Sequence, residues 1–465
     1  MRALALRQVL FLEVLYYMGT VINLPKIPKD HNYEDFIAAH LNAEGFFLER
    51  SIHKREGEEI LELDIVTNKF EADHVEKTFI EAKSGRKWGF PDIFKVKGWM
   101  VYLEYPTAYF IVLDETEKKM PFYQRVSNVL GIHLLSTPVV EDGVDDHELY
   151  EAFSISKREY NKMLVPLFRY AYVLERIMLL HLAEELRKKK DSHGLLNLKY
   201  LITTVNDSSF FTRNPKHRVA QIIDAFKCTA RLTAKICSER QGTKYEEIPE
   251  DVIIDTEIFK KLYHTCTEKD ILYTSLYAEL IEKLEILKCC VEEAQRPKEA
   301  SLFAQLEDGL LPENIRKGTE KLKLYSHFYL YPYLMQVFIY VFGGFILIEK
   351  EWEEYELLSE ITDVPLDEVH DALRVFDILF PKEDGGSWII TVPYSDIIQL
   401  DLMPIPFCGI GANLRRFLYC KTTGKYEDLK PQVSSYTYKD LNKWNNLLVT
   451  YLETSKDVEK FEKEK

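Results

Sequence analysis

The alternation of short β-rich runs with helical stretches between residues 26 and 137 constrains the fold more than any other feature of the sequence. Runs rich in β-branched and aromatic residues predict strands, whereas apolar residues spaced three and four apart predict helices. The predicted helices are 32–45, which Gly45 ends, and 90–103. The predicted strands are 46–53, 60–67, 77–85, 108–114 and a shorter run, 132–136. We therefore expect an α/β unit, with a mixed sheet flanked by helices, over 26–137.

The rest of the chain is predicted to be mainly α-helical. A helical region covers 138–324, and 325–400 has the element order of a winged helix. Within this module we expect, in order, a helix 333–342, a strand at FILI, helices 351–362 and 366–379, and a hairpin across KEDGGS (382–387). An N-terminal hydrophobic segment (1–25) and a C-terminal extension (401–465) complete the chain, and the sequence assigns no role to the extension.

The charge of the chain is unevenly distributed. It has 60 Lys and Arg against 75 Asp and Glu, a net charge of −15. This balance argues against a protein that coats DNA or an anionic membrane by bulk charge. However, 154–240 holds seventeen Lys and Arg against eight Asp and Glu, a local net charge of +9, whereas 241–323 has a net charge of −6. A nucleic-acid site would therefore have to be a local basic patch.

The cysteines and the hydrophobic segments predict a soluble, cytoplasmic protein. None of the seven cysteines forms a C-x-x-C pair or a Cys/His cluster with zinc-ligand spacing, which is typical of free thiols in a reducing compartment. Arg7 and Glu13 interrupt the N-terminal segment, which favours a helix packed on the protein, or an upstream start, over a signal peptide.

One internal stretch meets the length criterion for a membrane span. Phe328–Ile348 contains 21 residues without a charge. Pro332, Gln336 and the pair Gly343 and Gly344 interrupt it, so a buried core helix is favoured. A membrane-associated effector is kept as a distant alternative.

Four charged residues in the α/β unit could form a catalytic group. Asp64 lies in the strand LELDIVT, and Glu81 and Lys83 lie two apart in FIEAKSG, on the face opposite Ile80. The intervening segment is short enough for a hairpin, which would place Asp64 beside Glu81 and Lys83. Glu34 lies one turn into the preceding predicted helix. Two carboxylates and a lysine suit metal-assisted phosphodiester hydrolysis, because Mg²⁺ prefers carboxylate oxygens and acidifies a bound water.

The order helix Glu, strand Asp, Glu-x-Lys resembles the PD-(D/E)XK nuclease superfamily, in particular its Mrr-like restriction endonucleases and archaeal Holliday-junction resolvases. The resemblance covers about 30–137 and is carried by NYEDFIAAHLNAEGF, LELDIVT and FIEAKSG. It implies a restriction-endonuclease-like fold, a Mg²⁺ or Mn²⁺ cofactor held by Asp64, Glu81 and Glu34, and Lys83 as the catalytic lysine. Leu63 replaces the Pro of the family name. No residue clearly matches the Gln that some members carry, which leaves the branch open.

A structural interpretation competes with the catalytic one. Asp64, Glu81 and Lys83 could form a solvated cross-strand charge cluster on an ordinary sheet. The helix–strand–hairpin–helix context favours the catalytic interpretation, because it places all four residues on predicted polar faces.

Two basic groups are candidate DNA contacts. The first follows Lys83 and is interleaved with the aromatic residues Trp88, Phe90, Phe94 and Trp99; it comprises Arg86, Lys87, Lys95 and Lys97. The second, a predicted loop leading into a helix, comprises Arg213, Lys216 and Arg218. Basic side chains beside a metal site are suited to a phosphate backbone. The alternative is that the aromatic residues pack against the sheet while the lysines face water.

The third helix of the winged-helix-like module has the wrong charge for reading DNA. It carries Asp367, Glu368, Asp371 and Asp377 against a single Arg374. A contact with a partner protein, or homo-oligomer formation, is therefore expected of this module. Taken together, the sequence predicts a metal-dependent endonuclease that hydrolyses DNA, of a kind used in restriction or antiviral defence. The alternative is a non-catalytic nuclease-fold protein that acts as a nucleic-acid-binding or assembly scaffold.

Overall fold

The computed structural model describes most of the α/β unit and much of the C-terminal half of the chain. The described residues are 24–56, 58–85, 87–114, 120–141, 143–156, 161, 164–173, 175–176, 214–224, 226–227, 268–307, 309–347, 351–381, 389–391 and 397–400. The predictions for 1–23, for the C-terminal extension, and for Arg86 and Arg213 lie outside these residues.

A mixed five-stranded sheet forms the centre of the N-terminal half, in the order β1-β2-β3-β4-β5. Its strands are β1 (Phe47–Glu56), β2 (Glu58–Phe70), β3 (Val75–Lys83), β4 (Ala108–Leu113) and β5 (Ile132–Thr137). The first three strands are antiparallel neighbours, and β3, β4 and β5 run parallel. The five predicted strands and the predicted mixed α/β sheet are therefore confirmed, including the hairpin between β2 and β3.

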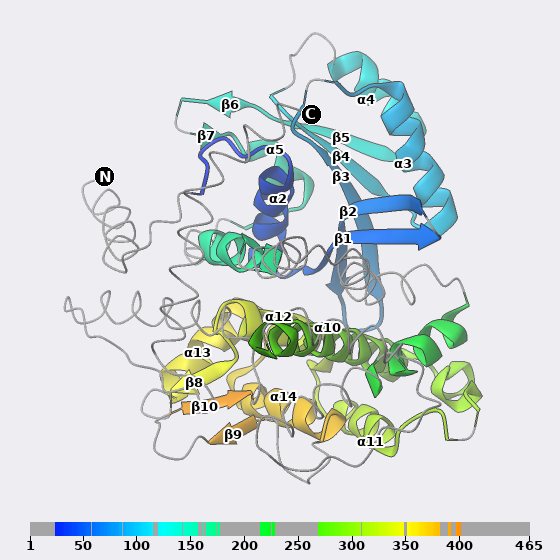
Figure 1. Cartoon of the computed structure of the whole chain (residues 1–465), viewed down its shortest axis with the longest axis vertical. Coiled ribbons are helices and arrows are strands. Elements are labelled where there is room, and N and C mark those ends of the chain that lie inside the picture. The colour runs from blue at the N-terminus through cyan, green and yellow to red at the C-terminus, as the bar shows by residue number, and fades with distance from the viewer. Residues whose placement is uncertain are drawn as a thin grey trace, which may run out of the picture.

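Helices cover both faces of the sheet (Figure 1). Helix α2 (His31–Ala43) packs on one face, where Ile80 and Ile111 belong to its apolar cluster. Helix α3 (Phe90–Leu103) packs on the other face, against Phe79 and Phe110. Neighbouring residues of β3 and β4 thus point to opposite faces, as the period of two in a strand requires.

The sequence did not reveal helix α4 (Met120–Val129), which connects β4 to β5 on the same side as α3. Only Met120 and Ser127 of this helix are buried, whereas Phe122 and Val129 are exposed. Because exposed apolar side chains alternate with the inward-facing Met120 and Tyr123, the apolar residues of this segment do not mark a single helical face in the sequence. After β5, the short hairpin β6 (Val139–Val140) and β7 (Gly143–Val144) leads into α5 (His147–Ala152).

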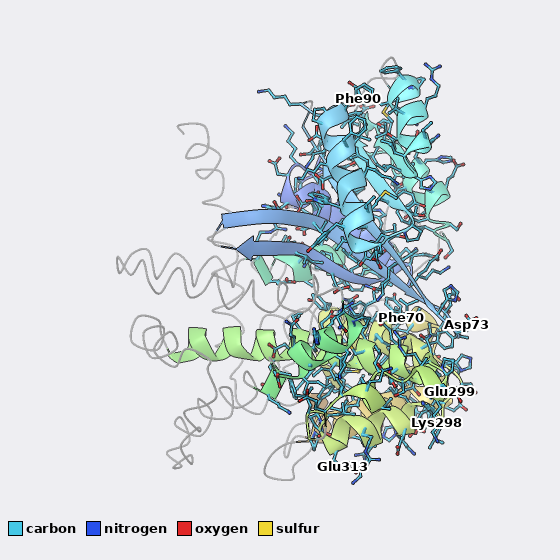
Figure 2. The ribbon with its side chains drawn as sticks, turned by 90° about the vertical axis from the view of Figure 1, so that its right-hand side faces the viewer. Phe70, Asp73, Phe90, Lys298, Glu299 and Glu313 are labelled. Atoms are coloured by element: carbon cyan, nitrogen blue, oxygen red, sulfur yellow. The ribbon has the colours of Figure 1, made fainter. Side chains whose placement is uncertain are left out.

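The C-terminal half is mainly helical and shares one apolar core with the α2 face of the sheet. Its helices are α10 (Glu268–Gln295), α11 (Glu313–Leu322), α12 (Tyr331–Tyr340), α13 (Glu351–Thr362) and α14 (Leu366–Leu379), with short 3-10 turns η1 (Lys298–Ala300), η2 (Phe303–Gln305) and η3 (Phe328–Leu330). The β2–β3 hairpin extends toward these helices, and Figure 2 shows Phe70 and Asp73 at its tip. In its turn, the Glu71 carbonyl accepts a hydrogen bond from Gln295 Nε2 of α10 over 2.7 Å.

The uncharged stretch Phe328–Ile348 contains helix α12, which is buried in the protein. Every residue from Tyr331 to Tyr340 is buried, which is typical of a helix at the centre of a core. Within the described part of the chain, no helix is both long and apolar enough to cross a membrane.

A small antiparallel sheet follows, in the order β8-β10-β9. Its strands are β8 (Phe345–Leu347), β9 (Ile389–Thr391) and β10 (Ile397–Leu400). Helix α14 ends at Leu379, as predicted, and the predicted hairpin across KEDGGS (382–387) lies outside the described residues. The winged-helix-like assignment of 325–400 stays a prediction.

Candidate active site

The candidate site lies at the carboxyl end of β3, beside which both α2 and α3 begin. Beside α2, the main-chain N–H of Asp30 donates a hydrogen bond to Ser84 Oγ over 2.7 Å, directly after the end of β3. At α3, Asp92 Oδ2 accepts from the Gly89 N–H over 2.9 Å and so caps the helix. Two helix starts are thereby fixed beside the end of one strand.

Asp64, Glu81 and Lys83 are brought together by the antiparallel pairing of β2 and β3. Ile65 pairs with Ile80, so the next positions along the two strands are those of Asp64 and Glu81. Asp64 Oδ2 accepts a hydrogen bond from the Ala82 N–H over 2.8 Å, and Lys83 Nζ lies 2.5 Å from Glu81 Oε1. The hairpin predicted from the sequence therefore produces the expected neighbours.

The two carboxylates are buried and their charges are incompletely balanced. Asp64 is 8% exposed and Glu81 is 1% exposed. Burial raises the pKa of Asp64 well above its ordinary value, and the nearby charges of Glu81 and Glu34 raise it further. Burial also raises the pKa of Glu81, although the ammonium groups of Lys83 and Lys95 oppose this effect.

Lys83 is the cation of the site. Burial lowers the pKa of its ammonium group, but the charge of Glu81 and the hydrogen bond to it more than compensate, and the net effect is a raised pKa. The side chain is one-third exposed, whereas Glu81 beneath it is almost fully covered. The ammonium group is therefore charged at neutral pH and open to the solvent on one side.

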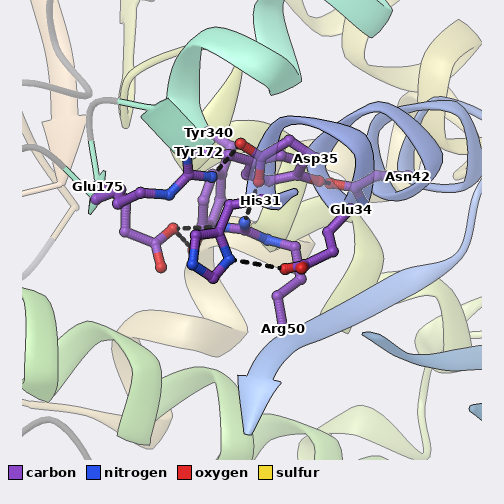
Figure 3. Close-up of polar contacts among 9 residues, drawn as sticks. His31, Glu34, Asp35, Asn42, Arg50, Tyr172, Glu175 and Tyr340 are labelled. Atoms are coloured by element: carbon purple, nitrogen blue, oxygen red, sulfur yellow. Dashed lines mark hydrogen bonds and ion pairs between the residues drawn. The ribbon is translucent and has the colours of Figure 1, made fainter. Parts of the chain in front are cut away.

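Glu34 is held by the first turn of α2, where His31 Nδ1 lies 3.1 Å from its Oε2 (Figure 3). Its neighbour Asp35 is 2% exposed and accepts hydrogen bonds from Arg50 of β1, over 2.9 Å, and from Arg176. Arg50 also donates to Glu175 over 2.7 Å. These ion pairs join α2 to β1, and they fix the turn of α2 that carries Glu34.

The donor atoms suit one hard divalent cation. Within the described residues, Glu81 Oε2 is buried without a hydrogen-bond partner. The second carboxylate, Asp64, lies beside it, and burial disfavours its charged form by raising its pKa. A divalent cation would offset both charges through oxygen ligands, which are the ligands that Mg²⁺ and Mn²⁺ prefer. No group of three or more His, Cys, Asp or Glu side chains in the described residues is arranged to hold a metal ion. Asp64 and Glu81 are thus the candidate direct ligands, and Glu34 as a ligand stays a prediction.

The described part of the first basic group borders the site. Lys95 of α3 lies 3.9 Å from Glu81 Oε1, and its Nζ lies 4.1 Å from the ring centre of Trp99. Lys87 is exposed in the loop before α3, and Lys97 is partly exposed on α3. Trp99 itself is buried in the apolar cluster under α3. The lysines therefore reach the solvent while Trp99 packs in the core. This arrangement is compatible with DNA contact, and it also agrees with the alternative that the aromatic residues pack against the sheet while the lysines face water.

The second basic group makes its described contacts elsewhere. Arg218 lies 3.7 Å from Glu285 of α10 and is 20% exposed, so its charge is used within the protein. The Lys216 N–H donates to Asn214 Oδ1, which caps the helical segment 215–224. A role for these residues in DNA binding stays a prediction, although the ion pair of Arg218 competes with it.

Two residues near the site were not singled out from the sequence. The charge of Asp92 acts on both Glu81 and Lys83, and His31 contacts Glu34. Asp92 had a local signal, since an acid in the first turn after Gly89 and Phe90 is typical of a helix start. The proximity of that helix start to β3 depends on the three-dimensional packing.

Comparison with known proteins identifies no family. No protein-family model matches the chain, and no curated protein matches it significantly. A chain from a structure of an oligomerised bacterial dynamin pair, described as providing a mechanism for the long-range sensing and tethering of membranes, matches at 12% identity with a TM-score of 0.13. That match covers 83% of this chain and 66% of the other.

Proposed function

We propose that the chain is a metal-dependent endonuclease of the PD-(D/E)XK type that hydrolyses phosphodiester bonds in DNA. One observation carries the proposal: Asp64 and Glu81 are buried side by side at the end of β3, with the Lys83 ammonium group 2.5 Å from Glu81. Burying two neighbouring carboxylates is costly unless a cation compensates them. Perturbed ionisation of such a group at an accessible edge is typical of functional sites.

The chemistry follows from the residues present. Asp64 and Glu81 would hold the Mg²⁺ or Mn²⁺ ion, which supplies positive charge at the scissile phosphate and acidity to a water. Lys83 stabilises the negative charge that develops on the phosphate as the water oxygen attacks phosphorus and the bond to the leaving oxygen breaks. Because pairing with Glu81 keeps Lys83 protonated, we assign it charge stabilisation rather than proton abstraction. Glu34 orients the attacking water from the side of α2.

The arrangement of the N-terminal half supports the superfamily assignment. A helix carrying Glu34 precedes an antiparallel hairpin carrying Asp64 and the Glu81/Lys83 pair, and a parallel strand follows through α3. These are the elements on which the sequence resemblance rests. A role in restriction or antiviral defence, in the cytoplasm, is part of the proposal by analogy with the superfamily.

The C-terminal module is proposed to contact a protein rather than DNA. Helices α13 and α14 with the sheet β8-β10-β9 would correspond to a winged helix. Its acidic helix α14 already contacts its own chain, because Glu368 accepts hydrogen bonds from the His327 N–H and from Tyr331. Carboxylates on this helix would repel phosphates, so we assign the module to partner binding or self-association.

A cleavage assay tests the proposed function. Supercoiled plasmid and linear single- and double-stranded DNA are incubated with the protein and Mn²⁺, Mg²⁺ or EDTA. We expect cleavage only with the metal ions, and a loss of at least about 100-fold in Asp64→Asn and Lys83→Ala. Lys69→Ala is the matched control, since Lys69 is a half-exposed lysine elsewhere on β2. It should cut like the wild type.

Two results would overturn the proposal. Equal products from wild type and Lys83→Ala would indicate a contaminating nuclease, and the absence of any cleavage would remove the catalytic role. Metal-independent DNA binding without cleavage would instead support the non-catalytic scaffold.

A further inference from the structure

Four aromatic rings, two of them exposed and two half-buried, form a cluster across the starts of α3 and α4. We call Phe90, Phe94, Phe122 and Tyr123 the aromatic platform. Phe94 is 57% exposed and Phe122 is 51% exposed. The ring centres of Phe94, Phe122 and Tyr123 lie 6.5, 5.5 and 4.8 Å from that of Phe90. Large exposed apolar side chains that cluster in this way usually mark a binding surface.

The platform is supported from below. The Trp88 ring lies between those of Tyr123 and of Phe110 in the strand β4, with ring centres 4.9 and 5.4 Å away and the rings tilted against one another. Phe110 is fully buried. The rings of the platform are therefore connected to the sheet through a chain of aromatic contacts, and their outer faces are held in place rather than displayed on a free loop.

The platform adjoins the candidate active site on the same helix. Glu81 of β3 pairs with Phe110 of β4, whose ring contacts Trp88 beneath the platform, and Lys95 of α3 lies 3.9 Å from Glu81 Oε1. Figure 2 shows Phe90 at the end of α3 that lies away from the C-terminal helices, so the C-terminal helices leave this end uncovered. A strand of nucleic acid with its phosphate at Lys83 would thus have aromatic rings within reach of its next bases.

The surrounding charge fits a polyanion. Helices α3 and α4 together carry three basic residues, Lys95, Lys97 and Arg125, against one acid, Asp92, whereas the whole chain has a net charge of −15. Asp92 is also committed to the cap of α3. The interface of a stable dimer would instead exclude charges from its centre and bury a larger apolar area. Interleaved rings and cations are typical of surfaces that bind single-stranded nucleic acid.

We infer that the aromatic platform stacks unpaired bases, and that the substrate of the candidate active site therefore carries a single-stranded segment next to the cleaved bond. This inference rests on the proposed nuclease function for its position and names the substrate class of that same site. A fully paired duplex would leave the platform unused, because stacked and paired bases offer it no open face. Lys95 would contact the phosphate between the stacked base and the cleaved bond.

Binding without cleavage tests the platform directly. Fluorescence anisotropy in EDTA compares a labelled single-stranded 20-mer with the corresponding duplex; the length of about 20 nucleotides exceeds the site size of single-strand binders. In Phe94→Ala/Phe122→Ala we expect the Kd for the single strand to rise about tenfold or more, since two stacking surfaces are lost. The Kd for the duplex should change less than about threefold. Trp352→Ala, which removes an exposed ring from α13, is the control and should leave both values unchanged.

A cleavage experiment separates this inference from the proposed function. Wild type and the double variant cut a single strand, a duplex with a single-stranded tail and a blunt duplex in Mn²⁺. We expect preferential cutting of the first two by the wild type, and loss of that preference in the variant. Cutting with unchanged preference and unchanged single-strand affinity in the variant would overturn the platform and leave the nuclease in place.

Three further outcomes would each support or overturn the aromatic platform. If no substrate is cut but single-strand binding still depends on the two rings, the nuclease proposal fails and the platform stands. If neither form of DNA binds to the wild type, the platform is overturned. If the double variant loses a dimer seen by sedimentation and binds single strands normally, the rings serve a second copy of the chain, which also overturns the inference.

Discussion

Gln336 closes the outer edge of the five-stranded sheet by bonding both main-chain polar groups of Leu48. Its Oε1 accepts from the Leu48 N–H over 3.0 Å, and its Nε2 donates to the Leu48 carbonyl over 2.9 Å. Leu48 lies in β1, the edge strand of the described sheet, whose main-chain groups facing away from β2 need other partners. A side chain from α12, all of whose residues are buried, thus occupies the place that a sixth strand would take.

Replacing Gln336 with leucine is expected to destabilise the protein by about 3 kcal/mol, because buried groups of Leu48 and Asn42 lose their partner. Asn42 is affected because its Nδ2 donates to Gln336 Oε1 over 2.8 Å. Met335→Leu, at the adjacent and equally buried position, should cost less than about 1.5 kcal/mol. The midpoint of urea unfolding measures both. Equal stability of wild type and Gln336→Leu would contradict the edge-closing role.

The same residue shows where prediction from the sequence stops. In the sequence, Gln336 is a polar interruption of an apolar run, which favours a buried helix over a membrane span. Its partner Leu48 lies 288 positions away, and no local pattern points to it. By contrast, β3 and β4 were predictable because their apolar composition is local, and α4 was missed because its exposed Phe122 and Val129 disguise its period.

In the candidate site, too, some features were predictable from local sequence and others depend on long-range packing. Alternation along a strand placed Glu81 and Lys83 on one face, and hairpin pairing placed Asp64 beside them. The first inference needs only the period of one strand, and the second needs only a short turn between two consecutive strands. The ion pair of Arg218 with Glu285 depends on the docking of α10, and no local pattern in the sequence indicates this carboxylate partner. Which partner a charged side chain contacts is therefore determined by long-range packing, which the local sequence does not reveal.

Arg50→Lys is expected to destabilise the protein by about 2 to 4 kcal/mol and to reduce cleavage. The guanidinium group bridges Asp35 and Glu175 and lies 3.5 Å from the ring centre of Tyr172, whereas an ammonium group cannot make these contacts together. Cleavage falls because the turn of α2 that carries Glu34 loses its tie to β1. Thermal unfolding and the cleavage rate are the measurements.

Arg316→Lys is the control for this change. Arg316 is about half exposed and pairs with Glu313 on the surface of α11, so its replacement should leave the free energy of unfolding close to that of the wild type. Similar losses of stability in Arg50→Lys and Arg316→Lys would show that the ion pairs of Arg50 stabilise the fold no more than a surface pair does.

The ion pair between Glu292 and Lys77 should make stability fall in acid. Burial alone would raise the pKa of Glu292, but Lys77, 2.7 Å away, and Arg218 outweigh it and hold the pKa at about 2, below its ordinary value of 4.5. A carboxylate with a lowered pKa in the folded state stabilises the fold above pH 4.5, and this contribution is lost as the pH falls toward 2.

Unfolding of Glu292→Gln against pH measures this contribution. Above pH 4.5 the variant should be less stable than the wild type by about 2 kcal/mol, and the two should converge between pH 4.5 and 2. Glu320→Gln, an exposed surface position, should follow the wild-type curve throughout. A constant difference between wild type and Glu292→Gln over this range would show that packing, not charge, distinguishes them.

Asp64→Asn should stabilise the protein in EDTA while removing its response to divalent cations. The substitution keeps an oxygen that can accept from the Ala82 N–H, and it removes a buried charge that faces Glu81 and Glu34. A gain of about 1 to 2 kcal/mol is expected from relieving that charge. In the wild type, Mn²⁺ should raise the melting temperature as a ligand of the folded state, and in the variant this rise should disappear.

Asp73→Asn, at a fully exposed acid in the β2–β3 turn, should keep both the wild-type stability in EDTA and the Mn²⁺ response. If Asp64→Asn were destabilised in EDTA, or if it retained the Mn²⁺ shift, the carboxylate would be a structural hydrogen-bond acceptor rather than a cation ligand.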